Sequence, residues 1–373
     1  LRTELQVLSY QRGPTRWVLK CPQHLERLGP LLAAFPDATI AFTLRDPVAV
    51  LQSAITMLAH GDRNRRLEVD ADGLAAYWVD RIARLLRENM IERHGITLRL
   101  FHGRGEFIEK YFETIADLRR RGFAVATMDW RGQGGSERKL KNPRKGHVND
   151  FAEYDKDVVR FMKEIVLPDC PPPYVALAHS MGGNVLIRGA TAPGSWFSRI
   201  VALAPMLAFN AEKVRYPEGV ARAYAEIGAL TGFASAYVLG GSDQPEEVVE
   251  FAGNPLTSDR ERWARNRSVI EAAPWLGLGA PTIGWLRAAY RSCHMIAEPR
   301  FARDVQVPML LFAAGNDRIV STRAIEEFGV KLKVGSHMLL AGSRHEILQE
   351  ADTIRQRFWA AFDAYLGVEA AAA

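Results

Sequence analysis

A serine in the stretch Val175–Asn184, which reads VALAHSMGGN, has the setting of a nucleophile. Ser180 follows an apolar strand pattern and precedes a helix pattern, and the residues two positions away on either side, Ala178 and Gly182, are small. Such a turn exposes a serine at the end of a sheet, where only small neighbours avoid a clash; Ala178 replaces the first glycine of G-x-S-x-G but meets the same demand. The alternative is a tight turn in which Ser180 caps the helix. We expect nucleophilic catalysis.

An acid and a histidine follow Ser180 in the order that this chemistry requires. Asp317 lies on a loop after the apolar run Pro308–Ala313, and His345 lies one strand and loop later. Loops at the carboxyl ends of neighbouring parallel strands meet over one crevice, so His345 can take the proton of Ser180 while Asp317 orients the imidazole. Alone, Asp317 could form an Asx turn, and His345 could be a surface residue or cap the last helix. The order Ser, Asp, His favours a catalytic triad.

Two backbone amides are expected to bind the oxyanion of a tetrahedral intermediate. One belongs to Met181, directly after the nucleophile, where the amino end of a helix favours negative charge. The other belongs to Arg104, because the preceding Gly103 lets the backbone turn inward. The alternative for this loop is an ordinary glycine-rich turn. Three nearby polar residues are expected to hold or shape the loops, with the second anchoring the turn that follows it: His102, Asp129 and His147.

The elements that must position these residues alternate between strands and helices. Strands are predicted over Ile96–Phe101, Phe123–Asp129, Tyr174–Ala178, Ile200–Leu203, Met309–Ala313 and His337–Leu340. Helices are predicted over Tyr111–Arg121, Tyr154–Leu167, Ala324–Phe328 and Ala351–Tyr365, and from Met181 onward. This alternation predicts a doubly wound, mostly parallel sheet in an α/β domain, with the site at the carboxyl ends of the strands. Between about 206 and 300 the alternation stops, which indicates a helical insertion over the sheet.

The chain of 373 residues divides into two unequal pieces, 1–92 and 93–373. The first piece alternates strand and helix patterns like a small α/β unit, and the charged stretch Glu88–Gly95 is the candidate boundary. An apolar content of 48% and a charged content of 24% are typical of a globular protein. We expect two domains, the larger of which carries the site.

Charge and cysteine content exclude several classes of protein. The three cysteines, Cys21, Cys170 and Cys293, are widely spaced and form no C-x-x-C pattern, so we expect free thiols, a reducing compartment and no metal site. The net charge of +5 is mild and not concentrated as in nucleic-acid-binding proteins. No secretory signal or membrane-spanning run is found. We expect a cytoplasmic protein whose charge is compatible with peripheral contact with the inner face of the membrane.

Several motifs of the second piece carry a resemblance to a known family. HGRGEFIEKY, DWRGQGGSERKL, RKGHVNDFAEYDKDV, LAHSMGG, WLGLGAPTIGWL and AGNDRIV…GSRHEIL together resemble the lysophospholipase L2 and monoacylglycerol lipase branch of the α/β-hydrolases, over nearly all of 96–366. The resemblance implies the α/β-hydrolase fold, a lid at about 206–300, the triad and oxyanion amides named above, and no metal or cofactor. It also implies an acyl ester of a single-chain lipid as substrate, either a lysophospholipid or a monoacylglycerol. Residues that could line an acyl channel, or form the core of the lid, are Trp263, Trp275, Trp285 and Leu286.

The first piece resembles a different family. The run RWVLKCPQHLERLGPLLAAFPDATIAFTLRDPVAVLQSA is similar to the later half of sulfotransferases that use 3′-phosphoadenosine 5′-phosphosulfate, over residues of about 1–89. Arg45 and Ser53 match the positions that hold the 3′-phosphate of the nucleotide in that family. The upstream loop that cradles the 5′-phosphosulfate is absent, so we expect a fragment of a fused or rearranged gene and no sulfotransfer. Residual nucleotide binding is the alternative.

Four functions remain open at this point. We expect a serine hydrolase that cleaves the acyl ester of a single-chain lipid through an acyl-enzyme on Ser180. An amide hydrolase of the aminopeptidase type would use the same residues on another substrate. A nucleotide-binding protein related to sulfotransferases would depend on Arg45 and Ser53 instead. A scaffold without catalytic activity is the remaining alternative.

Overall fold

The computed structural model describes residues 33–34, 96–210 and 217–368. The chain separates into two units, Leu1–Arg93 and His94–Ala373, and every strand described below belongs to the second. The expectations for the first piece lie outside the described residues, including its alternating elements, the boundary Glu88–Gly95, and the phosphate-binding positions Arg45 and Ser53.

Six parallel strands form one sheet in the order β2-β1-β3-β4-β5-β6. Their bounds are Ile96–Phe101 for β1, Phe123–Thr127 for β2, Tyr174–His179 for β3, Phe197–Leu203 for β4, Met309–Ala314 for β5 and Gly335–Leu340 for β6. From β1 the chain winds one way to β2, then crosses back to β3 and continues to β6. The predicted doubly wound sheet is confirmed. The direction in which successive strands are added to the sheet reverses between β1 and β3. Sheets of this kind bind ligands at such a point, beyond the carboxyl ends of the strands.

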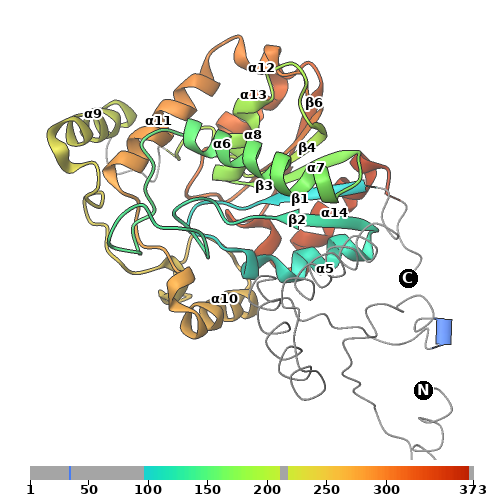
Figure 1. The fold of residues 1–373 in the computed structure, drawn as a ribbon, viewed down its shortest axis with the longest axis horizontal. Coiled ribbons are helices and arrows are strands. Elements are labelled where there is room, and N and C mark those ends of the chain that lie inside the picture. Colours follow the sequence, from blue (N-terminus) through green and yellow to red (C-terminus); the bar gives the residue numbers. More distant parts are fainter. Residues whose placement is uncertain (1–32, 35–95, 211–216, 369–373) are drawn as a thin grey trace, which may run out of the picture. The chain divides into compact units, whose positions relative to one another are not determined.

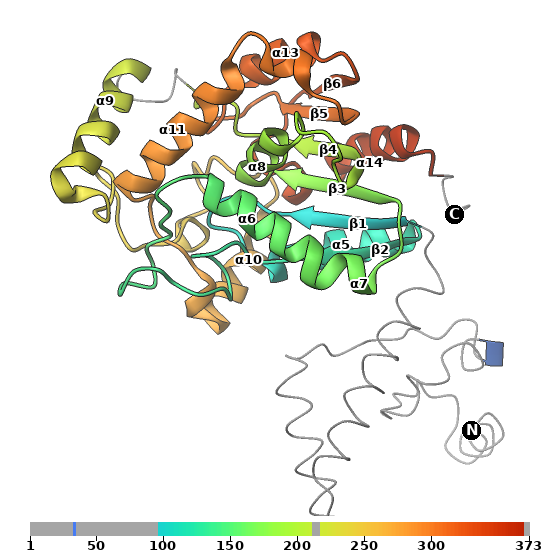
Figure 2. The ribbon, with the colours of Figure 1, turned by 45° about the horizontal axis from the view of Figure 1, so that its top comes forward.

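Helices cover both faces of the sheet (Figure 1, Figure 2). Residues of β1, β3 and β5 are almost all buried, as expected of strands covered by helices on both faces, although β1 includes the polar residues Thr97 and Arg99. On one face lie α6 (Ala152–Phe161), α8 (Met181–Gly189) and α13 (Thr322–Lys331), and on the other lie α5 (Phe112–Arg120) and α14 (Asp352–Leu366).

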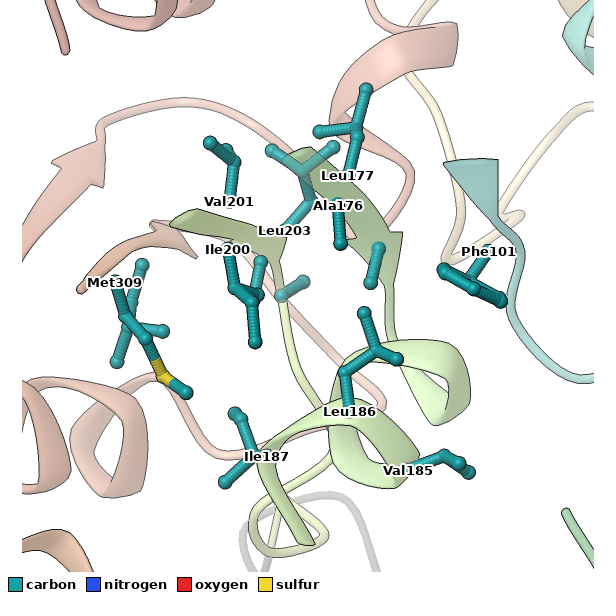
Figure 3. Close-up of a cluster of buried hydrophobic side chains, with 14 of the residues drawn as sticks. Phe101, Ala176, Leu177, Val185, Leu186, Ile187, Ile200, Val201, Leu203 and Met309 are labelled. Carbon is teal, nitrogen blue, oxygen red and sulfur yellow. The ribbon is translucent and has the colours of Figure 1, made fainter. Parts of the chain in front are cut away.

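The helix that follows the candidate nucleophile is firmly packed. Leu186 and Ile187 of α8 point toward Ile200 on β4, and Met309 of β5 lies beside them (Figure 3). Each fully buried aliphatic side chain of this kind contributes about 1.5–3 kcal/mol to stability. The amino end of α8, and with it the turn at Ser180, is therefore held against the sheet.

An insertion of helices connects β4 to β5. It contains α9 (Glu218–Gly228), a π-helical turn η4 (Ala229–Phe233), a 3-10 turn η5 (Glu246–Val248), α10 (Arg260–Ala272), α11 (Ile283–Ala297) and α12 (Phe301–Asp304). Asp259 and Thr282 cap α10 and α11 by accepting hydrogen bonds from the backbone of Arg262 and Trp285. Helices long and apolar enough to cross a membrane are not found among the described residues.

Candidate active site

Ser180 occupies a strained turn between β3 and α8. Its φ of 49° and ψ of −112° lie in a region that L-residues other than glycine seldom adopt, at a cost of about 1–3 kcal/mol. The turn persists because its backbone is bonded on both sides: the Ser180 N–H donates to the Leu203 carbonyl at 2.9 Å, and the Ser180 carbonyl accepts from Met206 at 3.0 Å. Ser180 precedes α8, but its hydroxyl makes no capping bond to the helix, so the capping interpretation is wrong.

The small neighbours of Ser180 are required by close backbone contacts. A Cβ at Gly182 would lie 2.6 Å from the Phe101 carbonyl oxygen and 2.7 Å from that of His102. Ala178 is fully packed within β3. The loop after β1 therefore lies directly against the start of α8, and this approach brings Gly103 next to Ser180.

Asp317 and His345 reach Ser180 from the ends of β5 and β6. The hydroxyl of Ser180 lies 2.9 Å from Nε2 of His345, and Nδ1 of His345 lies 2.7 Å from Oδ2 of Asp317. All three side chains are buried. The structure thus brings together the three residues that the sequence placed at separate strand ends.

The Asp317 carboxylate has two roles in this arrangement. Its Oδ1 accepts hydrogen bonds from the amides of Ile319 at 2.8 Å and Val320 at 2.9 Å, which is the Asx turn considered above, while Oδ2 faces His345. Burial alone would raise the pKa of Asp317, but His345 and the two amides outweigh it and lower that pKa. The Asp317 carboxylate is therefore ionised, and its orientation toward His345 is fixed. The surface and capping alternatives for His345 are wrong, because its buried ring bonds both Ser180 and Asp317.

The two predicted oxyanion amides belong to two segments that pack against each other next to Ser180. Met181 begins α8, and Arg104 lies in the loop after β1. Within that loop, Gly103 donates its N–H to Glu106 and Gly105 donates its N–H to Gln133, whereas the amide of Arg104 between them makes no hydrogen bond among the described residues. A Cβ at Gly103 would lie 2.9 Å from Oε2 of Glu106 and 3.2 Å from Cβ of Ser180, so a larger residue there would displace its neighbours. This arrangement can bind an oxygen that develops negative charge beside Ser180.

The other predicted residues lie around this centre. Asp129 anchors its turn as predicted, because it accepts hydrogen bonds from Gly135 at 2.8 Å and Ile108 at 3.0 Å, and its Oδ1 lies 3.0 Å from Nε2 of His102. His147 lies 2.9 Å from the hydroxyl of Thr282, so it joins its loop to the insertion.

The aromatic residues of the insertion are divided between core and surface. Trp263 and Trp285 are buried, as expected of a lid core, and Leu286 is half-buried. Trp275 is 65% exposed. Trp285 also lies 5.1 Å beneath the guanidinium of Arg104, so one side of this core touches the loop that carries the candidate oxyanion amide.

Sequence reasoning missed a buried group of charges directly behind Ser180 and His345. We call it the Lys110 cluster; its members are Glu106, Lys110, His179, Glu247 and Glu346. The spacing of Glu106 and Lys110 and the position of His179 just before Ser180 were visible in the sequence. Charged residues near loops are usually solvated, so only the fold reveals that these are buried together. Groups of three or more residues placed to hold a metal ion are not found in the part of the chain that the structure describes.

Comparison with known proteins agrees with the fold and with both resemblances. A family model described as serine aminopeptidase, S33, matches residues 93–352, and a sulfotransferase family model matches residues 2–116. Lysophospholipase L2 of Escherichia coli (strain K12) is 32% identical over 274 residues, 71% of this chain and 78% of that protein.

Two solved structures share the fold at low identity. The monoglyceride lipase of Saccharomyces cerevisiae has a TM-score of 0.57 at 17% identity, covering 74% of this chain and 87% of that one. The monoacylglycerol lipase of Paleococcus ferrophilus has a TM-score of 0.56 at 21% identity, covering 73% and 95%. The predicted α/β-hydrolase fold is confirmed.

Proposed function

The chain belongs to the serine aminopeptidase S33 family of hydrolases, and from that membership and the site geometry we propose that it hydrolyses the acyl ester of a single-chain lipid through an acyl-enzyme on Ser180. The observation that carries this proposal is the unbroken hydrogen-bonded chain from Asp317 through His345 to Ser180. Similarity to lysophospholipase L2 of Escherichia coli supports an ester of a lipid as the substrate.

Acylation begins when Oγ of Ser180 attacks the ester carbonyl carbon. His345 accepts the hydroxyl proton at Nε2, and Asp317 stabilises the imidazolium through the hydrogen bond at Nδ1. The carbonyl oxygen becomes an oxyanion that accepts hydrogen bonds from the amides of Met181 and Arg104. A single donor of this kind is worth about 2.7–4 kcal/mol of transition-state stabilisation.

The tetrahedral intermediate then collapses. The C–O bond to the alcohol breaks, the alcohol takes the proton from Nε2 of His345, and the acyl group remains on Ser180. Water repeats the sequence in the second half: it gives a proton to His345, attacks the acyl carbon, and releases the fatty acid as Ser180 recovers its proton. The net reaction consumes one water and requires no redox change.

An exposed apolar row on the insertion supports a substrate presented at a lipid surface. Along α9, η4 and the following turn, Val220, Ile227, Leu230, Phe233 and Leu239 are each more than half exposed. A depression of about 450 Å³ between α9 and α11 is lined by Arg222, Arg287, Arg291 and His294, and also by Glu226, which pairs with Arg287 at 2.6 Å. Apolar side chains beside basic ones are typical of contact with an anionic lipid surface. We propose peripheral contact through this row.

Hydrolysis of a panel of substrates tests the proposal. The panel contains a lysophospholipid, a monoacylglycerol, a short soluble acyl ester and an aminoacyl anilide, which represents the amide substrate named by the family description. We expect turnover of the lipid esters that Ser180→Ala abolishes. A preference for the anilide would assign the site to peptides, and unchanged esterase activity in Ser180→Ala would refute the mechanism.

A matched pair of variants tests the lipid surface. Leu230→Ser with Phe233→Ser should weaken turnover of vesicle-borne lipid several-fold while turnover of the short soluble ester stays unchanged. Val330→Ser, which alters a side chain 75% exposed on α13, serves as the control away from the insertion. An equal loss of turnover on vesicle-borne lipid and on the short soluble ester would show that these side chains do not act through lipid contact.

A further inference from the structure

The Lys110 cluster lies behind the reacting groups, and no step of the proposed mechanism uses it. The ammonium of Lys110 is 1% exposed and faces three carboxylates: Glu346 at 2.6 Å, Glu247 at 3.3 Å and Glu106 at 3.8 Å. A fully buried ammonium with three carboxylates is costly to assemble, because each charge loses its hydration. Helix packing alone does not require such a group.

Each of the three carboxylates belongs to a segment that the reaction depends on. Glu346 directly follows His345, and Glu106 lies two residues after Arg104 in the loop that carries the candidate oxyanion amide. Glu106 also accepts the amide of Gly103, so the shape of that loop depends on the position of this carboxylate. Glu247 belongs to the 3-10 turn η5 of the insertion. Lys110 is thus the common partner of three segments far apart in the sequence.

His179 is the member of the Lys110 cluster that lies next to the nucleophile. It directly precedes Ser180, its Nδ1 lies 3.1 Å from Glu106, and its Nε2 lies 3.1 Å from the carbonyl oxygen of His345. A carbonyl oxygen only accepts, so Nε2 carries a proton and donates it. The rings of His179 and His345 lie 4.8 Å apart. Movement of Glu106 would therefore displace both the turn at Ser180 and the loop that carries His345.

The charges within the cluster do not balance if all of its carboxylates are ionised. Burial alone would lower the pKa of His179, but the Glu106 carboxylate outweighs it and raises that pKa. With Lys110 and His179 both positive, three ionised carboxylates would still leave one excess negative charge. Burial accordingly raises the pKa of Glu346 to about 7 despite the neighbouring Lys110, and its Oε2 has no hydrogen-bond partner among the described residues.

We propose that Lys110 is a positioning residue for the reaction: by holding Glu106, Glu346 and Glu247 together, it fixes the His345 loop and the Arg104 loop at reacting distance from Ser180 and makes that alignment depend on the insertion. The inference rests on the proposed function. Its physical basis is the narrow tolerance of catalysis, since a displacement of about 1 Å costs on the order of 10²-fold in rate. Lys110 itself touches no reacting atom.

Lys110→Met in the full chain tests this inference. We measure kcat and KM on a short soluble acyl ester, count active sites with a fluorophosphonate that labels Ser180, and record the rate of labelling. We expect kcat per labelled site and the labelling rate to fall on the order of 10²-fold with KM nearly unchanged. Lys110→Arg, which keeps the charge, should recover part of the loss.

Arg355→Met is the matched control, because Arg355 is also a buried cation with carboxylate partners, Glu113 and Asp117, on helices away from Ser180. It should lower thermal stability and leave kcat per labelled site within about twofold of wild type. Equal kcat per labelled site in Lys110→Met and Arg355→Met would overturn the inference while leaving the proposed function intact. Failure of wild type itself to be labelled at Ser180 would instead refute the proposed function.

Two milder variants keep the test decisive if Lys110→Met does not fold. Glu346→Gln and Glu247→Gln each remove one charge and leave the ammonium with its other partners. We expect kcat to fall several-fold in Glu346→Gln and less in Glu247→Gln, again with little change in KM. Wild-type kcat in both variants would overturn the inference.

Discussion

Two ion clusters connect the insertion to the rest of the domain, and they differ in which charge is in excess. In the Lys110 cluster, Lys110 and His179 face three carboxylates, and every side chain is buried. In the second, which we call the Glu113 cluster, arginines from α10 and α14 surround a partly exposed glutamate on α5; its members are Glu113, Asp117, Arg262, Arg265 and Arg355. The first touches the loops of the candidate site, and the second joins helices.

The pKa of a glutamate carboxyl group shifts in opposite directions in the two clusters. Burial raises the pKa of Glu346 to about 7, and Lys110 does not compensate for it. Burial also acts on Glu113, but hydrogen bonds from Arg262 and Arg265 outweigh it and lower the pKa of Glu113 to about 2. We therefore expect the ionised Glu113 to stabilise the fold and the ionised Glu346 to lower its stability, which agrees with the positioning role proposed for Lys110.

The largest difference between the two regions is expected from a pair of aspartates. Asp317→Asn should lower kcat by about 10⁴-fold, because an amide at this position favours the wrong tautomer of His345. Asp117→Asn in the Glu113 cluster makes the same chemical change and should leave kcat within about twofold. Steady-state rates on a soluble ester measure both. Similar rates for the two variants would show that Asp317 does not act on His345 during the reaction.

A pair of glycines tests the packing next to the Lys110 cluster. Gly103→Ala would place a Cβ 2.9 Å from Oε2 of Glu106 and 3.1 Å from Nδ1 of His179, so we expect kcat to fall on the order of 10²-fold. A Cβ added at Gly189, at the end of α8, would have no atom within 4 Å, so Gly189→Ala should leave kcat unchanged. A Gly103→Ala enzyme with wild-type kcat would show that the loop tolerates displacement.

Stability is the property that the Glu113 cluster should control. Arg262→Met removes charged hydrogen bonds to Glu113 and one to the Glu350 carbonyl, so we expect a loss of about 2 kcal/mol in unfolding free energy with kcat unchanged. Arg267→Met breaks only an exposed pair with Glu271 and should cost less than about 0.5 kcal/mol. Urea unfolding compares them. A fall in kcat for Arg262→Met would give both clusters the same role.

The smallest expected effect is a pH dependence of opposite sign in the two clusters. The raised pKa of Glu346 contributes stability that is complete below its ordinary value of 4.5 and is lost as pH rises through about 7. Glu346→Gln lacks this loss, so its stability relative to wild type should improve by on the order of 1 kcal/mol between pH 5 and pH 8.

Glu113 should show the reverse trend. Its lowered pKa contributes stability that is present above its ordinary value of 4.5 and is lost as pH falls through about 2. The destabilisation in Glu113→Gln should therefore be constant at neutral pH and shrink in acid. Urea unfolding across this range measures both variants, and parallel trends would contradict the contrast between the clusters.

The sequence was sufficient to predict the sheet and the triad of Ser180, Asp317 and His345. Each of these features is marked by residues close to it in the sequence. Small neighbours mark Ser180, and a strand followed by a loop precedes both Asp317 and His345. Some boundaries were less visible: β4 begins at Phe197 rather than Ile200, since exposed Ser198 and Arg199 interrupt its apolar pattern.

Contacts between distant segments could not be predicted in the same way. Glu247 and Glu346 read as solvated charges, and nothing near them in the sequence indicates that both face Lys110. The helix predicted over Tyr154–Leu167 ends as an α-helix at Phe161 and continues as a π-helical segment, Met162–Val166, which has no clear sequence signal. Pairings of this kind depend on the topology, which brings residues more than a hundred positions apart into contact.

In the proposed mechanism, Ser180 carries the acyl group. The most direct test of this step is mass spectrometry of the full chain after reaction with a fluorophosphonate and, separately, after rapid acid quenching during turnover of an acyl ester. We expect one phosphonyl group and a transient acyl group on Ser180, both absent from Ser180→Ala, whose hydrolysis falls by about 10⁴-fold or more. An adduct on another residue, or undiminished hydrolysis by Ser180→Ala, would contradict it.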